Sequence, residues 1–249
     1  ADRQDPAGAL DPAAANAATD ELAAVLEVLA HRMSVLVPRP LQALRHTWQS
    51  RPPRPEENTP TGARENIHRH YDLSNDLFEL FLDPSLTYSS AWFEPGDDLD
   101  TAQVRKIDAI LDLARMRPGM RVLEIGSGWG ALAMRAARSR DVHVTTLTLS
   151  EAQRELALRR IADAGLSQRI DVLLEDYRDL QGRYDRVVSI EMIEAIGARH
   201  QETYFARIGA LLEDDGQALV QAITIEDHRY ARALRSVDFI QRYVFPGGM

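Results

Sequence analysis

Three glycines follow a short apolar run that contains a single acid. The segment RVLEIGSGWG, residues 121–130, places Gly126, Gly128 and Gly130 directly after Glu124 and Ile125. In parallel α/β sheets, the turn from the first strand into its helix closely approaches the bound ligand. Glycines there remove the Cβ atoms that would keep a ligand away from the backbone. The pattern predicts a ligand-binding turn, with a purely structural turn as the alternative.

The position of the acid indicates which ligand this turn would bind. A dinucleotide fingerprint has the spacing G-x-G-x-x-G and an acid about 20 residues later. Here the glycines alternate, residues 144–149 read VTTLTL, and Glu124 precedes the glycines. A carboxylate suits a cationic ligand with an ammonium group, so the pattern favours S-adenosylmethionine over NAD. A nucleophilic serine turn is excluded, because G-x-S-x-G would need glycine where Ile125 and Trp129 stand.

The elements that would position this turn are apolar strands alternating with helical stretches. We expect strands at 120–125, 142–149, 169–174, 184–190 and 217–224, and helices at 129–139, 150–164, 199–213 and 227–243. Such alternation is typical of an α/β fold with a parallel sheet and crossover helices. Ahead of it, Ser74 or Asn75 can cap a short helix, and Asp100 with Gln103 resembles a capping box that starts a second helix.

Composition excludes several classes of protein. The 249 residues can bury the core of one main domain. A net charge of -9 argues against a general nucleic-acid binder, which needs a basic surface. The chain contains no cysteine, which rules out disulfides and fits a reducing cytoplasm. No signal-peptide pattern and no apolar run of about 18 residues is present, so we expect no membrane-spanning helix.

Three regions differ in composition. Residues 1–20 are rich in Ala, Pro and Asp and predict a disordered tail. Residues 21–62 predict a helical N-terminal segment followed by a Pro-rich linker, and residues 63–249 form the main domain. No acid occurs between Glu27 and Glu56, although this stretch contains Arg32, Arg39, Arg45, Arg51 and Arg54. These arginines either meet an anionic lipid surface or are simply solvated, and both readings stay open.

Seven segments in order carry a specific resemblance over roughly residues 66–249. They are HYDLSND (70–76), LDP with TYSSAWF (82–93), EIGSGWG (124–130), TLSEAQ (148–153), DYRD (176–179), YDRVVSIEMIEAIG (184–197) and FPGG (245–248). This series resembles the cyclopropane fatty acid synthase family, which includes mycolic acid cyclopropane synthases and a 10-methylene fatty acid synthase subgroup.

The resemblance implies a class I methyltransferase: a Rossmann-like parallel sheet with helices on both faces, here preceded by a helical N-terminal extension. Its members use S-adenosylmethionine to alkylate the cis double bond of an unsaturated acyl chain in a membrane phospholipid. The product, formed via a carbocation, is a cyclopropane or a methylene- or methyl-branched chain. The alternatives are a small-molecule O- or N-methyltransferase and a noncatalytic subunit that binds lipid or cofactor.

The resemblance also implies partners and a location. We expect a homodimer at the inner face of the cytoplasmic membrane, acting on phospholipid and not on nucleic acid. If the product is a methylene intermediate, a partner reductase would follow. The family fold normally continues with an antiparallel hairpin, which we expect to be absent from this sequence, since it ends at Met249.

The resemblance carries the cofactor site onto a set of matching positions. Gln153 is expected near the ribose and Asp176 near the adenine. The full set is Tyr88, Ser89, Glu124, Gly126, Gly128, Thr148, Leu149, Gln153, Asp176 and Tyr177.

Catalytic residues follow from the same comparison. Tyr88 is expected to face the carbocation with its π cloud, whereas Phe93 is assigned to core packing. Glu194 is the candidate for holding or acting as the base that removes a proton. Glu191 is expected to touch the cofactor or to cap a helix.

Two positions depart from the better-known members. Ser90 replaces a cysteine and Gln221 replaces a histidine; in those members the two residues help bind a bicarbonate that serves as base. Ser90 and Gln221 can still donate hydrogen bonds. Bicarbonate therefore stays open as a cofactor, with a direct carboxylate base as the alternative. His68 and His70 lack a matching ligand cluster, so no metal is expected.

Overall fold

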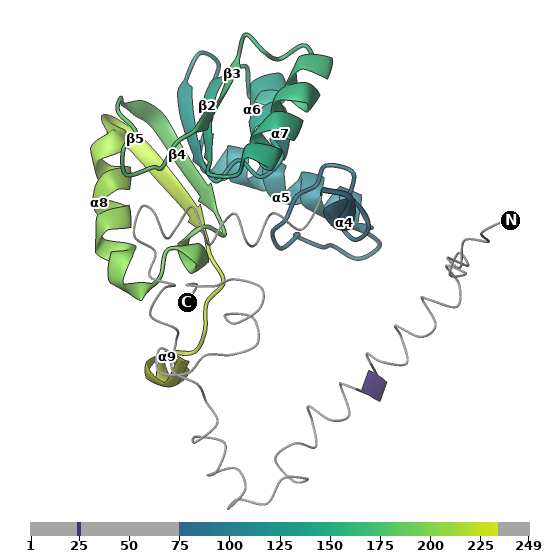
Figure 1. Ribbon diagram of the computed structural model, residues 1–249, viewed down its shortest axis with the longest axis vertical. Helices are drawn as coiled ribbons and strands as arrows, with labels where there is room; N and C mark the ends of the chain where they lie inside the picture. Colours follow the sequence, from purple (N-terminus) through teal and green to yellow (C-terminus); the bar gives the residue numbers. More distant parts are fainter. Residues whose placement is uncertain (1–23, 26–74, 234–249) are drawn as a thin grey trace, which may run out of the picture. The chain divides into compact units, whose positions relative to one another are not determined.

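The core of the protein is a five-stranded parallel sheet (Figure 1). The computed structural model describes residues 24–25 and 75–233. The strand order is β3-β2-β1-β4-β5. The strands are β1 (Arg121–Ile125), β2 (His143–Thr148), β3 (Ile170–Leu174), β4 (Tyr184–Ile190) and β5 (Leu212–Gln221). All five expected strands are confirmed, and so is the α/β class.

The last strand begins earlier than expected. Tyr184 of β4 pairs with Leu212, but Arg186 pairs with Gln217, so β5 contains an irregularity that accommodates extra residues. Such a bulge lets residues that lack strand periodicity join a strand. This is why β5 starts at Leu212 rather than at 217, and it ends at Gln221 rather than at 224.

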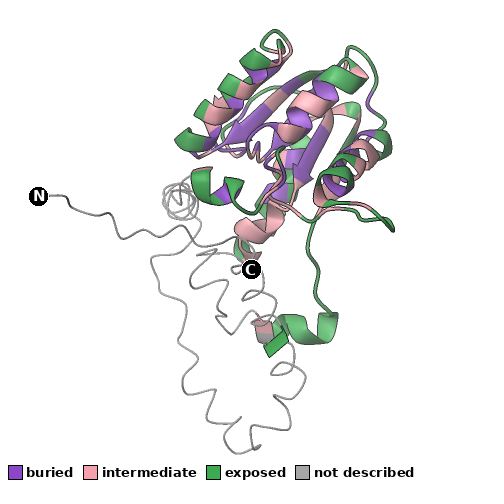
Figure 2. Ribbon diagram, turned by 90° about the vertical axis from the view of Figure 1, so that its right-hand side faces the viewer, coloured by how far each residue is buried: buried purple, intermediate pink, exposed green. Residues whose placement is uncertain are grey.

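Two apolar layers enclose the sheet, because successive side chains of a strand point to opposite faces. Val122 of β1 packs in the layer with α5 (Leu99–Leu113), α6 (Ala131–Arg140) and α7 (Glu151–Asp163). Leu123 and Ile125 pack in the other layer, against α8 (Gln201–Leu211). The central strands are accordingly buried on both faces (Figure 2). Helices on both faces are thus confirmed.

The helix starts follow local capping chemistry, with one correction. Ser150 accepts a hydrogen bond from the Gln153 backbone N–H and caps α7 where expected. The expected capping box of Asp100 and Gln103 is wrong. Asp98 is the N-cap of α5, and its side chain accepts from the Thr101 N–H. The helix therefore begins one residue before Asp100, which leaves the Gln103 side chain available for another contact.

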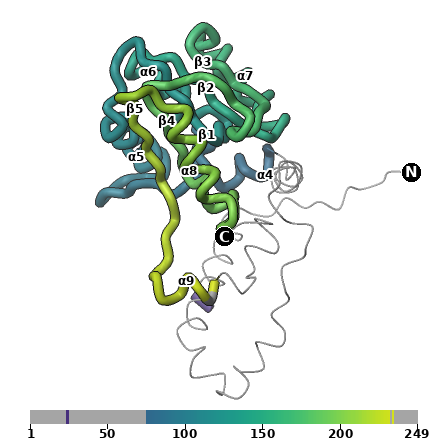
Figure 3. The backbone as a smooth tube through the Cα atoms, turned by 90° about the vertical axis from the view of Figure 1, so that its left-hand side faces the viewer, coloured from purple at the N-terminus to yellow at the C-terminus, as the bar shows by residue number. Residues whose placement is uncertain are grey.

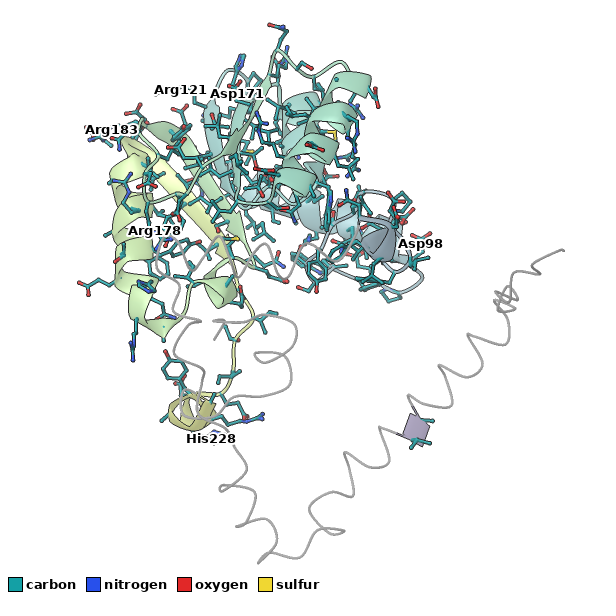
Figure 4. The ribbon with its side chains drawn as sticks, viewed as in Figure 1. Asp98, Arg121, Asp171, Arg178, Arg183 and His228 are labelled. Carbon is teal, nitrogen blue, oxygen red and sulfur yellow. The ribbon has the colours of Figure 1, made fainter. Side chains whose placement is uncertain are left out.

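The strand order reverses between β1 and β4, since β2 and β3 lie on one side of β1 and β4 and β5 on the other. A ligand binds at such a switch point, beyond the carboxyl ends of the strands. In Figure 4, Arg121 and Arg183 mark the opposite, amino-terminal edge, whereas Arg178, which follows β3, lies toward the carboxyl edge. The switch point is where the glycine turn stands.

Several expected regions lie outside the described residues. Only Ala24 and Val25 of the N-terminal segment are described, both in a helix. The tail at 1–20, the linker and the end of the chain are not described. The chain divides into units 1–50 and 51–249. Short helices stand at α4 (Asn75–Glu79) and α9 (Asp227–Ala233), and Figure 3 traces the backbone from β5 into α9. None of the helices described is long and apolar enough to cross a membrane.

Candidate active site

The glycine turn wraps over the end of β2. The backbone N–H groups of Gly126 and Ser127 both donate to the Leu147 carbonyl, at 3.1 and 2.7 Å. Gly126 has a φ of 96°, which side-chain-bearing residues rarely adopt. A Cβ on Gly126 would lie 2.5 Å from Cγ of Met192, whereas one on Gly128 would meet nothing within 4 Å. Gly126 is therefore required for packing, and Gly128 faces open space.

A pocket opens beside this turn, and all ten residues of the expected cofactor set line it. They come from the β1, β2 and β3 ends and from the loop before α5. Lys106, Arg178 and His200, to which the sequence analysis gave no role, also line it. Glu191, which was expected to touch the cofactor or to cap a helix, lines it as well. The structure thus brings together side chains as far apart in the chain as Tyr88 and Tyr177. The individual roles assigned to them stay predictions.

Glu124 is the buried acid of the pocket. Its side chain is 4 % exposed, and the Thr146 hydroxyl donates to its Oε2 at 2.6 Å. Burial raises the pKa of Glu124 to about 8, and the Thr146 hydrogen bond only partly opposes this rise. No cation pairs with Glu124 among the residues that the structure describes. A cationic ligand in the pocket would favour the ionised carboxylate.

The end of β2 presents an amide to the pocket. The Thr148 hydroxyl donates to Oε1 of Gln153 at 2.9 Å and accepts from the Ser150 N–H. This contact fixes the Gln153 side chain and directs its amide nitrogen away from Thr148. The nitrogen can then donate to a ligand hydroxyl, as the expected ribose contact requires.

The end of β3 carries a buried ion pair. Asp176 is 3 % exposed and accepts a two-pronged contact from Arg178, with Nε–Oδ1 at 2.9 Å and Nη2–Oδ2 at 2.6 Å. The same guanidinium lies over the Tyr177 ring, 5.6 Å from its centroid. Asp176 lines the pocket, but much of its acceptor capacity serves Arg178. The pair makes a rigid wall at this end.

Tyr88 closes the pocket as part of an aromatic cluster. Its ring meets those of Phe78 and Phe81 edge-on, with centroids 5.3 and 6.2 Å apart. Burial raises the pKa of the Tyr88 hydroxyl, so the phenol stays neutral. The core role expected for Phe93 is wrong, because Phe93 is 56 % exposed. The neighbouring Trp92 donates its N–H to the Ala102 carbonyl on α5.

Two polar residues on α5 hold the loop that carries Tyr88. Nε2 of Gln103 donates to the carbonyls of Thr87 and Ser89, at 3.2 and 2.8 Å. Nζ of Lys106 donates to Oγ of Ser89 at 2.5 Å. Burial lowers the pKa of Lys106 to about 8, although the nearby Glu191 and Asp83 carboxylates oppose the shift. The sequence analysis named Gln103 only for a capping box and did not name Lys106. Their signal was their place on the apolar stripe that includes Ile107 and Ile110.

Ser90 and Gln221 converge on Glu191, the first residue after β4. Oε1 of Glu191 accepts from the Ser90 N–H at 3.0 Å, from the Ser90 hydroxyl at 2.6 Å and from Nε2 of Gln221 at 2.8 Å. Nε2 of Gln221 also lies 3.1 Å from Oγ of Ser90. Of these three residues, only Glu191 lines the pocket.

Glu194 lies a short step along the chain, in a 3-10 helix at Ile193–Ala195. Its Oε1 accepts from the Ile223 N–H at 2.5 Å, and its Oε2 is buried without a partner among the described residues. The contact ties Glu194 to the segment that follows β5 and Gln221. Glu194 is not part of the pocket lining.

Comparison with known proteins places this geometry in a family. The model of mycolic acid cyclopropane synthetase matches residues 58–249. The chain belongs to this family. The family therefore covers the whole of the sheet and the pocket that the structure describes, and the resemblance drawn from the seven segments is confirmed.

Three known proteins that are similar to this chain are informative. The tuberculostearic acid methyltransferase UfaA1 of Mycobacterium tuberculosis is 46 % identical over 92 % of this chain and 55 % of its own length. The cyclopropane-fatty-acyl-phospholipid synthase of Escherichia coli K12 is 41 % identical over 72 % of this chain and 45 % of its own. A crystal structure of the mycolic acid cyclopropane synthase CmaA1, complexed with SAH and CTAB, is 38 % identical with a TM-score of 0.69, covering 74 % of this chain and 68 % of that one.

The chain spans about half the length of the first two relatives. The fold and the family are thus shown for the residues compared. The class I methyltransferase fold expected from the sequence is confirmed by the sheet and by its structural neighbours.

Proposed function

We propose that this chain is an S-adenosylmethionine-dependent C-methyltransferase that alkylates the cis double bond of an unsaturated fatty acyl chain in a phospholipid. The product is a cyclopropane or a methylene- or methyl-branched acyl chain. The names of the relatives support this reading, since they describe a methyltransferase and synthases of modified fatty acids.

One observation carries the cofactor assignment: a buried carboxylate that no cation of the described residues pairs with, beside a glycine turn at the switch point of the sheet. S-adenosylmethionine has an ammonium group and supplies an electrophilic methyl group on a sulfonium. We assign Glu124 to the ammonium group, and Gln153 to the ribose. Asp176 and Tyr177 form the wall at the adenine end, with Gly126 and Gly128 leaving the backbone open.

The remaining pocket residues suit a reaction that must exclude water. An alkene is a weak nucleophile, so the rate gain comes mainly from aligning it with the methyl group. Tyr88, neutral and held in the aromatic cluster, is assigned to stabilising positive charge on the acyl chain. Glu194 is assigned to holding or acting as the base, and its carboxylate accepts a hydrogen bond from the Ile223 N–H, two residues after Gln221.

The test is turnover on a defined lipid. The full chain is incubated with S-adenosylmethionine and vesicles of dioleoyl phospholipid, and the acyl chains are examined by mass spectrometry. One added carbon per modified chain is expected, and gas chromatography of the methyl esters then separates a ring from a methylene branch. Saturated phospholipid is the matched control and should gain nothing.

Two other outcomes would replace the proposal. Methylation of soluble amines or phenols without lipid turnover would indicate a small-molecule methyltransferase. Binding of S-adenosylmethionine without any turnover would indicate a noncatalytic subunit. Release of S-adenosylhomocysteine distinguishes the two, since both bind the cofactor and only the small-molecule methyltransferase turns it over.

The proposed substrate also implies a location and partners. We propose that the chain acts peripherally at the inner face of the membrane, as a homodimer, with a reductase downstream if the product is a methylene. The arginines at 32–54, in a stretch without acids, support attraction to anionic lipid. Cosedimentation with vesicles that contain increasing fractions of anionic lipid tests this.

A further inference from the structure

Glu191 is held in an unusual backbone conformation. Its φ is 50°, in the left-handed region that glycine favours. A residue with a side chain in such a region costs about 1–3 kcal/mol and persists where the surrounding structure enforces it, often at functional sites. The Glu191 backbone N–H is meanwhile bonded to the Gln221 carbonyl at 2.9 Å. The strain therefore points the side chain in one fixed direction at the end of β4.

Three donors orient the Glu191 carboxylate, and all three contact the same oxygen. The Ser90 N–H, the Ser90 hydroxyl and the Gln221 amide donate to Oε1. No donor among the described residues contacts Oε2. Because Glu191 lines the pocket, its second oxygen is available to a group inside.

This donor set does not fit a bound bicarbonate. Ser90 and Gln221 stand where the family resemblance places residues that bind that anion, but here their donors already serve a resident carboxylate. A second anion at the same place would be repelled, because like charges a few ångströms apart oppose each other's ionisation. Lys106 interacts electrostatically with Glu191, but its Nζ donates its hydrogen bond to Ser89.

We propose that Glu191 takes the place of the external anion and is the proton acceptor of the reaction, so that this chain needs no bicarbonate. The inference rests on the proposed function for its chemical step. It differs from the assignment of the base to Glu194, whose bonded oxygen serves the Ile223 backbone.

The step balances with the groups named. The π electrons of the alkene form a bond to the methyl carbon as the carbon–sulfur bond breaks, which leaves a carbocation on the acyl chain. Glu191 removes a proton from the new methyl group, and the C–H electron pair closes the cyclopropane ring. If a neighbouring hydride first shifts to the cationic carbon, the same proton loss gives an exocyclic methylene. The proton then passes from Glu191 to water.

A carboxylate is a strong enough base for this step, because a carbocation of this kind is a strong acid. Position is the more demanding requirement, since a general base must lie within hydrogen-bond reach of the proton that it removes. The donors and the backbone conformation supply that position.

The test compares three variants with the wild-type chain. Glu191→Gln keeps the shape and removes the base. Glu191→Gly suits the backbone conformation and opens space for a small anion. Glu202→Gln, an exposed acid on α8, is the matched control. Each is assayed on dioleoyl phospholipid vesicles, in buffer depleted of carbon dioxide and in buffer with added bicarbonate or formate, and S-adenosylhomocysteine affinity is measured by calorimetry.

We expect wild-type turnover to change less than twofold on adding bicarbonate. Glu191→Gln should lose about 10²-fold or more, the contribution of a positioned general base, with cofactor affinity within about threefold of wild type. Some of its residual product should be a methyl-branched alcohol, from water capturing the carbocation. Glu191→Gly should be partly rescued by bicarbonate or formate, in a saturable manner, and Glu202→Gln should be unaffected.

Other results would overturn the inference. Wild-type turnover that requires bicarbonate would do so, as would Glu191→Gln with full activity while Glu194→Gln has none. If no lipid is methylated, the proposed function fails, but calorimetry with bicarbonate still decides the anion assignment. If bicarbonate binds to Glu191→Gly and not to wild type, Glu191 occupies the place of the anion, as proposed. If bicarbonate binds to wild type, that proposal is refuted.

Discussion

Glu124 is expected to release a proton when a cationic ligand binds. The pKa of this carboxyl is raised to about 8 in the folded chain because the group is buried. It is therefore protonated at neutral pH until a cation arrives, and a ligand ammonium would displace that proton. Calorimetric titrations with S-adenosylmethionine at pH 7, in buffers of different ionisation enthalpy, should show about one proton released per ligand bound. Identical heats in all buffers would contradict this reading.

The same shift predicts how stability depends on pH. A raised folded-state pKa stabilises the protein below the unfolded value of 4.5, and this contribution is lost as the pH rises through about 8. Glu124→Gln lacks this dependence. Without ligand, the thermal midpoint of this variant relative to that of wild type should rise from pH 5 to pH 8. Its cofactor affinity should fall about 10- to 100-fold, because a charged hydrogen bond is lost.

Thr146→Val is the matched control for that variant. It removes the hydroxyl that donates to Glu124 and keeps the carboxyl group. The pKa of Glu124 should rise further, because the hydrogen bond that opposes burial is gone. The proton release on binding should then persist. A Thr146→Val variant that behaves like Glu124→Gln would assign the effect to packing and not to charge.

At the scale of elements, α5 and the loop before it act as one unit. Gln103 bonds the carbonyls on both sides of Tyr88 and thus sets where the loop meets the pocket. Gln103→Met keeps the length of the side chain but removes both donors. Two lost hydrogen bonds of about 1 kcal/mol each should weaken cofactor binding roughly 10-fold and also lower the stability of the chain.

Arg105→Met separates these two effects. Arg105 lies on the same helix and pairs with Asp97 and Glu94 away from the pocket. This control should lose some stability and keep its affinity for S-adenosylhomocysteine. If both variants lower the affinity equally, α5 matters only as a packed helix and the loop contact has no separate role.

At the scale of the whole molecule, the pocket is lined by segments that come from separate parts of the chain. The glycine turn, the ends of β2 and β3 and the loop before α5 all line it. A ligand that touches all four should therefore stabilise the fold as a unit. At 100 times its dissociation constant, S-adenosylhomocysteine should add about 2.7 kcal/mol, which raises the thermal midpoint by roughly 5–10 °C for a domain of this size.

NAD is the control for that measurement. It shares the adenosine group but carries phosphates and no ammonium group, so it offers no ammonium partner to the buried carboxyl at the glycine turn. At the same concentration it should leave the midpoint unchanged. A shift with NAD as large as that with S-adenosylhomocysteine would overturn the cofactor assignment and, with it, the proposed reaction.

Local patterns were enough to predict the elements and the glycine turn, and the family resemblance supplied most of the remaining pocket. The apolar strands alternate with amphipathic helices, and each pattern depends on neighbours a few residues apart, so it survives in the sequence. The parallel topology then brings the ends of β1, β2 and β3 to one edge. The pattern placed Gly126 at a ligand-binding turn, and the family resemblance added Thr148 and Asp176, which end or follow the other two strands.

The sequence by itself determined the family, the parallel sheet and the glycine turn with its acid, because spacing and residue type encode them directly. Only the tertiary structure decided which groups meet behind the pocket. Glu191 collects donors from Ser90 and Gln221, which are 101 and 30 residues away along the chain. Lys106 likewise contacts Ser89 because α5 packs against the loop that carries Ser89. Such contacts depend on how whole elements pack, and no local pattern records them.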